Sequence, residues 1–294
     1  MDRHVKILLD TDIGTNSDDA LCLSWLLANP ACDLLGITTV TGEAAKRAES
    51  ADAICRSAGR SVPVFPGAEQ PLVITQRQTV CEQYHAISPH VLKADVSHDG
   101  AVDFLSRTIR KHPGDITIIT IGPLTNIAML FKKDPGVTRL LGGIVSMCGN
   151  YGAGPVKEDS TETNVRLDPH AAEAVFRQSL PRHCCAGIDV TRSLTMDRSR
   201  FMRDIYPLLL TPVKRMAEMW FTERETVTFH DPLAAMIALI HDVCTYERGD
   251  ISVAIEDGEQ RGRTDWRPDG SGTVEIANHV DRERFFSLYS STFL

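Results

Sequence analysis

The sequence predicts an α/β protein with a single open, mostly parallel sheet flanked by helices, a Rossmann-like arrangement. Apolar segments rich in β-branched residues alternate along the chain with segments whose apolar residues recur at helical spacing. The segment 34–40 is rich in β-branched residues and does not alternate between apolar and polar, as expected of a strand that is covered on both faces. Because no internal repeat, low-complexity tract or linker divides the 294 residues, we expect one domain over 1–294.

The first half of the chain is predicted to alternate between strand and helix. Short apolar runs predict strands at 6–9, 34–40, 62–65, 115–121 and 143–147. Apolar residues at helical spacing predict helices at 18–28, 44–58 and 99–111, and another that follows Asn126 to about 133. The first helix is expected to end at Asn29-Pro30, and Pro63 places the third strand near a sheet edge. Residues 67–98 lack periodicity and predict a long loop of the kind that often covers a site.

The second half is predicted to be richer in helices. A Gly-rich loop over 149–163 precedes a helix over 169–178, which begins at Asp168-Pro169, an acidic cap followed by proline. The remaining predicted elements are a strand at 183–190, helices at 197–205, 207–222 and 231–241, strands at 251–255 and 273–278, and a closing helix from 281. The stretch 256–272 between the last two strands is rich in turn residues.

Composition excludes several classes of partner. With 43% hydrophobic and 24% charged residues the chain is globular, and its net charge of −8 argues against nucleic-acid binding, which needs a basic face. No apolar run approaches the roughly 18–20 residues of a membrane span. The first strand starts almost at the N-terminus, so we expect no signal peptide. Eight scattered cysteines without a CxxC pair predict a reduced, cytoplasmic protein.

Four carboxylates follow the first strand within ten positions. Gly14 and small polar residues that suit a tight loop lie among Asp10, Asp12, Asp18 and Asp19. Acids crowded at the end of a buried strand repel one another, so either most of the loop is solvated or a cation holds it together. We favour the cation.

Other predicted strand ends carry further oxygen-bearing or small residues. In an open parallel sheet, ligands bind beyond the carboxyl ends of the strands. The segments predicted to meet there are 41–43, 121–123 and 147–149, and Asp231 opens a helix that can face the same site. Carboxylate and carbonyl oxygens suit a hard cation, and the spacing of zinc ligands is missing, so calcium or magnesium is indicated.

These motifs resemble those of the inosine–uridine-preferring nucleoside hydrolases. The segment 10–19 is similar to the family's DxDxGxDD loop, with two more residues between the glycine and the paired acids. The resemblance continues at 37–42, 121–128, 162–164 with Asp168-Pro169, 230–232 and, weakly, 264–266, which are in the family's order over nearly the whole chain. It implies the nucleoside hydrolase fold and cleavage of an N-glycosidic bond.

The resemblance implies a calcium site and attack by water. Its metal contacts would be Asp12, Asp19, Asp231 and the main-chain carbonyl of Ile121, and Asp12 would also take a proton from the attacking water. Asp10 would orient the loop from behind. Water attack without a covalent nucleophile implies inversion at the sugar carbon.

The resemblance also places the substrate. Asp18 and Asn164 would bind the ribose 2′- and 3′-hydroxyls, Glu162 together with Met147 would hold the 5′-hydroxyl, and His230 would lie near the leaving base. The expected substrate is a ribonucleoside or a related ribosylated metabolite, and the expected products are ribose and the free base. We expect a homo-oligomer, either dimer or tetramer.

The sequence departs from the family's motifs at three places. These departures predict that the parts of the site that contact the base and the 5′-hydroxyl differ from those of the family. Glu43 stands where the family has asparagine, and Val156 or Lys157 falls near another missing asparagine. Within 76–98 only 84–86 remains as a counterpart of the family's HGxxG stretch. A substrate other than a common nucleoside therefore stays open.

Two other functions are compatible with parts of the sequence. The segment 10–15 is near the DxDGT loop of haloacid-dehalogenase-type phosphatases, but Ile13 interrupts it and Asp18-Asp19 follow too soon. The second alternative is a non-catalytic homologue that binds ribosylated ligands. Structural roles also stay open for Asp231 as a helix cap and for His230 as a packed histidine.

Overall fold

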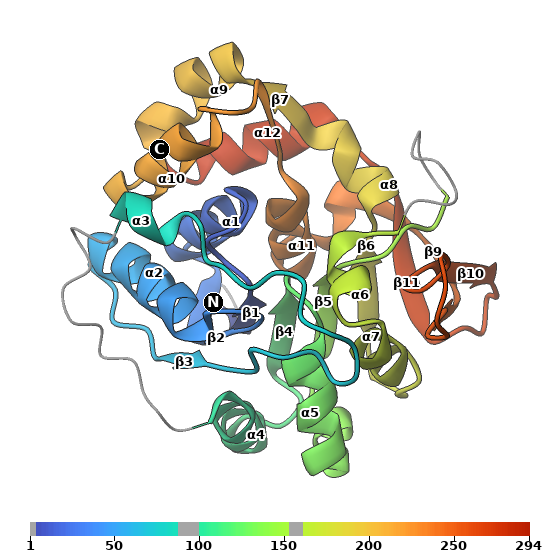
Figure 1. Cartoon of the computed structure of the whole chain (residues 1–294). Coiled ribbons are helices and arrows are strands. Elements are labelled where there is room, and N and C mark those ends of the chain that lie inside the picture. Colours follow the sequence, from blue (N-terminus) through green and yellow to red (C-terminus); the bar gives the residue numbers. More distant parts are fainter. Residues whose placement is uncertain (1–3, 88–99, 153–160) are drawn as a thin grey trace.

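The computed structural model describes residues 4–87, 100–152 and 161–294. In this part of the chain a sheet of nine strands forms the centre of the molecule (Figure 1). Its strands are β1 (Val5–Thr11), β2 (Cys32–Thr39), β3 (Val64–Pro66), β4 (Ile116–Thr120), β5 (Gly143–Met147), β6 (His183–Ala186), β9 (Cys244–Val253), β10 (Thr264–Pro268) and β11 (Val274–Val280).

The sheet is mostly parallel, which confirms the predicted fold class. The strand order is β10-β9-β11-β6-β5-β4-β1-β2-β3. All neighbours from β3 to β11 are parallel, and only β9 pairs antiparallel, with β11 on one side and β10 on the other. The carboxyl ends of β1, β4 and β5 therefore lie side by side, which is where the sequence places its acidic and glycine-containing segments.

Helices cover both faces of the sheet. The helices are α1 (Asp18–Ala28), α2 (Ala44–Ser57), α3 (Tyr84–Ile87), α4 (Ala101–Lys111), α5 (Thr125–Lys133), α6 (Thr163–Leu167), α7 (Pro169–Phe176), α8 (Ile188–Thr191), α9 (Arg198–Asp204), α10 (Thr211–Trp220), α11 (His230–Leu239) and α12 (Arg282–Ser291). Short 3-10 helices span 135–140, 192–194, 206–208 and 241–243, and a two-stranded sheet pairs β7 (Thr195–Asp197) with β8 (Thr226–Thr228).

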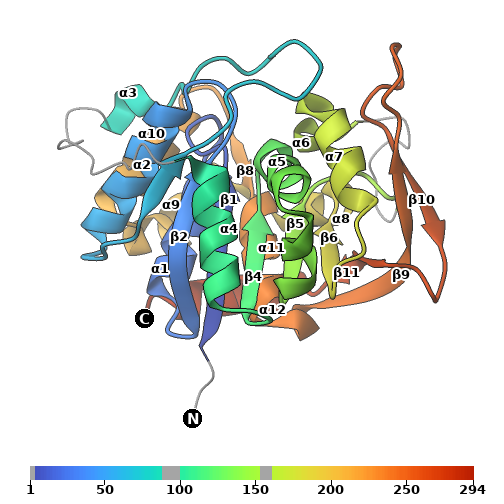
Figure 2. The ribbon, with the colours of Figure 1, turned by 90° about the horizontal axis from the view of Figure 1, so that it is seen from below.

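The central strands are apolar without alternation because each face packs against its own core. In β1, Ile7 and Leu9 belong to the core under α1, α2, α11 and α12, whereas Leu8 belongs to the core under α4, α5 and α7. Figures 1 and 2 show these two helix groups on opposite sides of the sheet. Full burial of these three side chains explains why consecutive positions in the middle of this central strand are all apolar.

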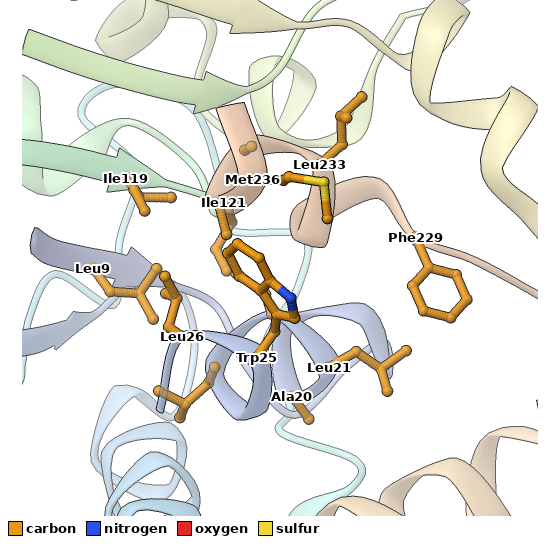
Figure 3. Packing of buried hydrophobic residues seen from close by; sticks show 14 of the residues in the cluster. Leu9, Ala20, Leu21, Trp25, Leu26, Ile119, Ile121, Phe229, Leu233 and Met236 are labelled. Carbon is orange, nitrogen blue, oxygen red and sulfur yellow. The ribbon is translucent and has the colours of Figure 1, made fainter. Parts of the chain in front are cut away.

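The core around Trp25 also fixes the positions of α1 and α11, two helices that carry acidic residues in their first turns. The indole of Trp25 on α1 lies among Leu9 of β1, Ile121 at the end of β4 and Met236 of α11, as Figure 3 shows. These four side chains are at most 1% exposed. Because α1 and α11 pack through this core, their first turns are held at the same edge of the sheet.

Several elements differ from the sequence-based expectation for a physical reason. The strand predicted at 183–190 ends at Ala186, because Gly187 starts the turn into α8. The strand predicted at 251–255 begins already at Cys244, since only part of its face is buried and its exposed positions are polar. The turn-rich stretch 256–272 contains the edge strand β10, whose polar sequence and terminal proline conceal it.

Other differences concern small elements. The predicted helices 197–205 and 207–222 begin later than expected, as α9 and α10, and the residues 195–197 before α9 pair with β8. The acidic cap at Asp168 is confirmed, since its side chain accepts a hydrogen bond from Ala171 N–H. The positions 156 and 157, where the family's asparagine was expected, lie outside the described residues.

Two further findings concern membrane spans and cysteines. Across the described residues, no helix is both long enough and apolar enough to cross a membrane. All eight cysteines lie in the described part of the chain, and each is a buried free thiol.

Candidate active site

Six carboxylates are buried at the carboxyl edge of the sheet. Asp10 and Asp12 lie at the end of β1, Asp18 and Asp19 form the first turn of α1, Asp231 is in the first turn of α11, and Glu162 precedes α6. None of the six residues is more than 7% exposed. Figure 2 looks onto the sheet through α4 and α5, with the loops after β1 and β3 above the strands. A concentration of buried acids of this kind requires a compensating cation or protonation.

Three of these carboxylates converge. One oxygen from each of Asp18, Asp19 and Asp231 lies within 4.8 Å of the other two. Burial, together with the neighbouring acids, raises the pKa of Asp18 to about 7 and the pKa values of Asp19 and Asp231 well above the ordinary range. A bound divalent cation would reverse these shifts, so the donor set fits a hard cation with oxygen ligands.

This group of three differs partly from the predicted ligand set. Asp19 and Asp231 were predicted as metal contacts, but Asp18 was predicted to bind the ribose diol. Asp12 lies outside the group, although its charge helps to raise the pKa values of the other three acids. The role of Asp12 at a metal and the role of Asp18 at the ribose diol therefore stay predictions.

Asp12 is positioned from two sides. Its Oδ2 accepts a hydrogen bond of 2.7 Å from Gln78 Nε2, on the loop that follows β3. A Cβ at Gly122 would lie 2.9 Å from Asp12 N and 3.1 Å from Asp12 Oδ1, so glycine is what allows this close approach. Burial raises the pKa of Asp12, and the Arg47 guanidinium and the Gln78 amide oppose that rise.

Asn164 joins the ends of two strands. Its Nδ2 donates to the main-chain carbonyls of Ile121, at 3.1 Å, and Met147, at 3.0 Å. The Ile121 carbonyl was predicted as a metal contact, and its second lone pair can still serve a cation. The structure thus brings Ile121, Met147 and Asn164 together, while their contacts with metal and sugar remain predictions.

Glu162 caps helix α6 with its side chain. Oε1 accepts from Asn164 N at 2.7 Å, and Oε2 accepts from Val165 N at 3.0 Å and from Gly149 N at 3.2 Å. Burial raises the pKa of Glu162 to about 7. The carboxylate therefore fixes the segment that carries Asn164, in addition to its predicted contact with the 5′-hydroxyl.

His230 begins α11 directly before Asp231. Its Nδ1 lies 2.6 Å from Thr191 Oγ1, at the end of α8. Burial and the nearby charge of Arg192 lower the pKa of His230 to about 4, so the ring is neutral at pH 7. Its predicted place beside the leaving base stays a prediction.

Asp10 is hydrogen-bonded to side chains of the neighbouring strand and helix and is not part of the group of three acids. Its Oδ1 accepts from the Thr38 hydroxyl of β2 and, at 2.7 Å, from Asn126 Nδ2 of α5. Burial raises the pKa of Asp10 to about 7. The residue thus ties β1 to its neighbours, which agrees with the predicted role of orienting the loop.

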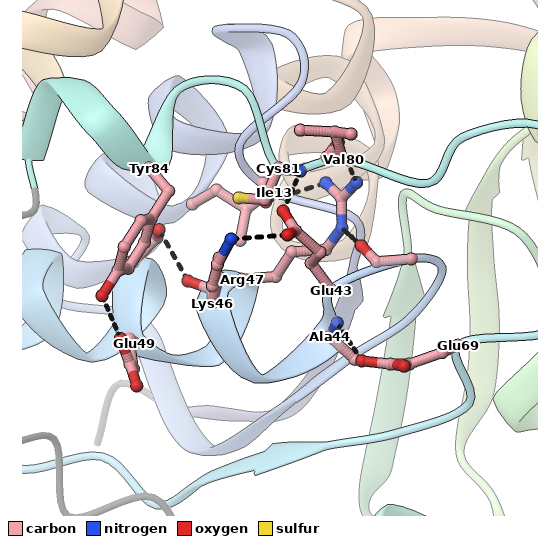
Figure 4. A network of polar contacts seen from close by, with 12 residues as sticks. Ile13, Glu43, Ala44, Lys46, Arg47, Glu49, Glu69, Val80, Cys81 and Tyr84 are labelled. Carbon is pink, nitrogen blue, oxygen red and sulfur yellow. Dashed lines mark hydrogen bonds and ion pairs between the residues drawn. The ribbon is translucent and has the colours of Figure 1, made fainter.

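Arg47, on α2, is completely buried near the acidic loop and was not among the residues predicted for the site (Figure 4). It lies on the same helix face as Ala44 and Ala51, which are also buried. A charged residue on an otherwise apolar helix face was the available signal. Gln78 was also missed, because it lies in a loop without periodicity and its contact with Asp12 spans 66 positions.

Glu43, the departure from the family's asparagine, has a left-handed backbone with φ of 58°. Its carboxylate pairs with Lys46 and accepts a hydrogen bond of 2.8 Å from Cys81 N–H, as Figure 4 shows. This residue therefore anchors the loop after β3 to the start of α2.

Comparison with known proteins decides the family. The model of the family described as inosine-uridine preferring nucleoside hydrolase matches residues 7–287. The chain belongs to this family. The membership confirms the predicted enzyme class, an N-glycosyl hydrolase of the nucleoside hydrolase type, and the phosphatase alternative no longer applies.

Individual relatives match over different lengths. An uncharacterized protein of Schizosaccharomyces pombe is 30% identical over 97% of both chains. The pyrimidine-specific ribonucleoside hydrolase RihB of Escherichia coli is 34% identical over 196 residues, which are 63% of this chain and 60% of RihB.

Solved structures of nucleoside hydrolases share the fold. A plant nucleoside hydrolase superposes with a TM-score of 0.85 at 23% identity, and a purine-preferring ribonucleoside hydrolase from Gardnerella vaginalis with a TM-score of 0.82 at 25% identity. Each comparison covers 98% of both chains. The nine-stranded sheet and its helices are therefore those of the nucleoside hydrolase fold.

Proposed function

We propose that this nucleoside hydrolase cleaves the N-glycosidic bond of a ribonucleoside or a related ribosylated metabolite, with calcium held among its buried acids. The observation that carries the calcium proposal is the convergence of Asp18, Asp19 and Asp231 within 4.8 Å, in a site of six buried carboxylates. Carboxylates packed this closely are costly unless a cation or protons compensate their charge.

The ligands that we propose for calcium are the carboxylates of Asp12, Asp19 and Asp231 and the carbonyl of Ile121. Hard carboxylate and carbonyl oxygens are the ligands that calcium prefers, and Asp18 adds a further carboxylate at the same place. When bound, calcium would lower the pKa of a water molecule and place it next to the sugar.

The side chains of the chain itself would activate the water and hold the sugar. Asp12, with its carboxylate oriented by Gln78, would accept a proton from the attacking water, a role worth roughly 10²–10⁴-fold in rate. Asp18 and Asn164 would grip the ribose diol, and Glu162 with Met147 would hold the 5′-hydroxyl. These contacts orient the sugar and strengthen as positive charge develops on its ring in an oxocarbenium-like transition state.

The leaving group is the least constrained part of the proposal. The neutral ring of His230, hydrogen-bonded to Thr191, would lie beside the leaving base. Glu43 is turned to Lys46 and Cys81, so it is unsuited to the sugar or water contact of the family's asparagine. We therefore propose a ribosylated substrate without fixing its base.

A panel of nucleosides and ribosylated metabolites tests the proposal. Release of free ribose is measured with and without calcium, with Asp12→Asn as the matched variant. We expect at least one substrate to release ribose, and Asp12→Asn to lower turnover at least ~10²-fold while circular dichroism stays unchanged. Binding of ribosylated ligands with no ribose release would instead support the non-catalytic alternative.

A further inference from the structure

We propose that Arg47 is a positioning residue for hydrolysis, which locks the segment 78–83 onto the acidic loop 12–15 so that Gln78 orients the Asp12 carboxylate. The inference rests on the proposed function, in which Asp12 accepts the proton of the attacking water. Three sets of contacts lead to it.

The first set consists of the hydrogen bonds of the Arg47 guanidinium. Nε donates to the Gly42 carbonyl at 2.8 Å, and Nη2 donates to the Val80 carbonyl at 3.0 Å. Nη1 donates to the carbonyls of Asp12 and Ile13 and to the Thr15 hydroxyl. Figure 4 shows the guanidinium between Ile13 and Val80. One planar group thus holds three separate segments, and its rigid fork fixes how they sit relative to one another.

The positive charge of Arg47 is buried without an ion-pair partner among the described residues. In the described part of the chain it is the only lysine or arginine buried to this degree, and it forms no ion pair there. All its partners are carbonyl oxygens and one hydroxyl, while six carboxylates are buried in the same region. A buried guanidinium that binds carbonyls instead of carboxylates neutralises none of these acids through an ion pair.

The second set ties the segment 78–83 to the turn before α2 and to the acidic loop. Gly42 N–H donates to the Gln78 carbonyl at 3.2 Å, and Gln83 N–H donates to the Gly14 carbonyl at 2.8 Å. A Cβ at Gly42 would lie 2.5 Å from the Gln78 carbonyl oxygen, so glycine is needed for this contact. With the Glu43–Cys81 bond, these contacts determine where Gln78 lies.

The third set consists of the hydrogen bonds of the Gln78 side chain, which reach Asp12. The Gln78 amide donates to Asp12 Oδ2 at 2.7 Å and to the Thr15 hydroxyl at 2.9 Å. Thr15 lies in the stretch that makes this acidic loop two residues longer than the form of the motif given above, and both Arg47 and Gln78 contact it. The pair therefore stabilises the longer loop in the one arrangement that presents Asp12.

Kinetics of Arg47 variants test the inference. We expect Arg47→Ala to lower kcat roughly 10²-fold with a smaller change in KM, because a displaced base lowers the rate of the chemical step more than substrate binding. Arg47→Lys should recover part of the loss, and millimolar guanidinium should partly rescue Arg47→Ala. Arg56→Ala is the matched control: it removes another arginine of α2, one that pairs with Asp52, and should keep wild-type kcat.

Two further measurements keep the test decisive. If Arg47→Ala does not fold, Gln78→Ala should still lower kcat about tenfold, because the half-buried Gln78 carries the last contact to Asp12. Wild-type kcat in folded Arg47→Ala or in Gln78→Ala would overturn the inference. A wild-type protein that releases no ribose would contradict the proposed function and not the inference about Arg47. In that case a crystal structure of Arg47→Lys tests the inference. A 12–15 loop in its wild-type position would overturn it, and a displaced loop that has lost the Gln78–Asp12 hydrogen bond would support it.

Discussion

The side-chain amide of Asn164 donates a hydrogen bond to the main-chain carbonyl of Ile121 across 3.1 Å. A second bond from the same nitrogen reaches the Met147 carbonyl at 3.0 Å. A residue expected to bind the sugar therefore also holds the ends of β4 and β5, one of which was expected to contact the metal. Position 164 thus couples the proposed sugar site to the proposed metal site.

Replacing this donor by an acceptor tests that coupling. In Asn164→Asp a carboxylate oxygen would face two carbonyl oxygens, so we expect kcat/KM to fall at least ~10²-fold and stability to fall by about 1–3 kcal/mol. Asn278→Asp is the control, because the side chain of Asn278 accepts a hydrogen bond from Thr245 and aspartate can still accept it. Unchanged kinetics in Asn164→Asp would refute the role of Asn164.

A single methyl group at Gly122 should disturb Asp12. Its Cβ would lie 2.8 Å from Val40 Cγ1 and 2.9 Å from Asp12 N, closer than real Cβ atoms come, so the end of β1 must shift. We expect Gly122→Ala to lower kcat roughly 10²-fold, measured on folded protein. Gly270→Ala is the control, since nothing lies within 4 Å of a Cβ there. Equal activity of the two variants would show that the packing around Asp12 tolerates displacement.

His183 should make stability depend on pH. Burial lowers the pKa of His183 to about 4, and the ring stacks on Phe176 at the start of β6. Between about 6.5 and 4 the unfolded state binds a proton that the folded state does not, so stability falls as pH falls through this window, by roughly 3 kcal/mol at most.

Denaturant unfolding at several pH values measures this contribution. The stability advantage of wild type over His183→Phe should shrink as the pH drops from 7 to 4. A constant difference between wild type and His183→Phe would contradict the expected contribution of His183.

Metal removal should act on both stability and activity. After chelation and dialysis, the repulsion among Asp18, Asp19 and Asp231 is uncompensated, so we expect a lower Tm and loss of ribose release, both restored by calcium. Chelated protein that keeps full activity would remove calcium from the account.

Much of the fold could be predicted because strands that are buried on both faces consist mostly of apolar and β-branched residues. Segments such as 34–40 are rich in apolar and β-branched residues without alternation, and the Asp168-Pro169 pair marks a helix start. The strands β9 and β10 were missed or shortened because they are partly exposed at the sheet edge, where polar residues are tolerated. Local pattern is weakest where burial is incomplete.

The sequence indicated which acidic residues belong to the candidate site, but it did not indicate how they are grouped in space. The cluster at 10–19 and Asp231 follow from spacing and strand ends, whereas the grouping of Asp18 with Asp19 and Asp231 depends on how α1 and α11 pack. Arg47 leaves only an indirect local signal, a charge on an otherwise apolar helix face, and Gln78 leaves none, because their contacts with the acidic loop join residues far apart in sequence.

The central claim is that buried carboxylates at this edge of the sheet hold a divalent cation. A crystal structure determined in millimolar calcium tests it most directly. The account predicts one ion bound by Asp12, Asp19, Asp231 and the Ile121 carbonyl. Side chains of Asp12, Asp19 and Asp231 that point apart, with no ion between them at that calcium concentration, would contradict it.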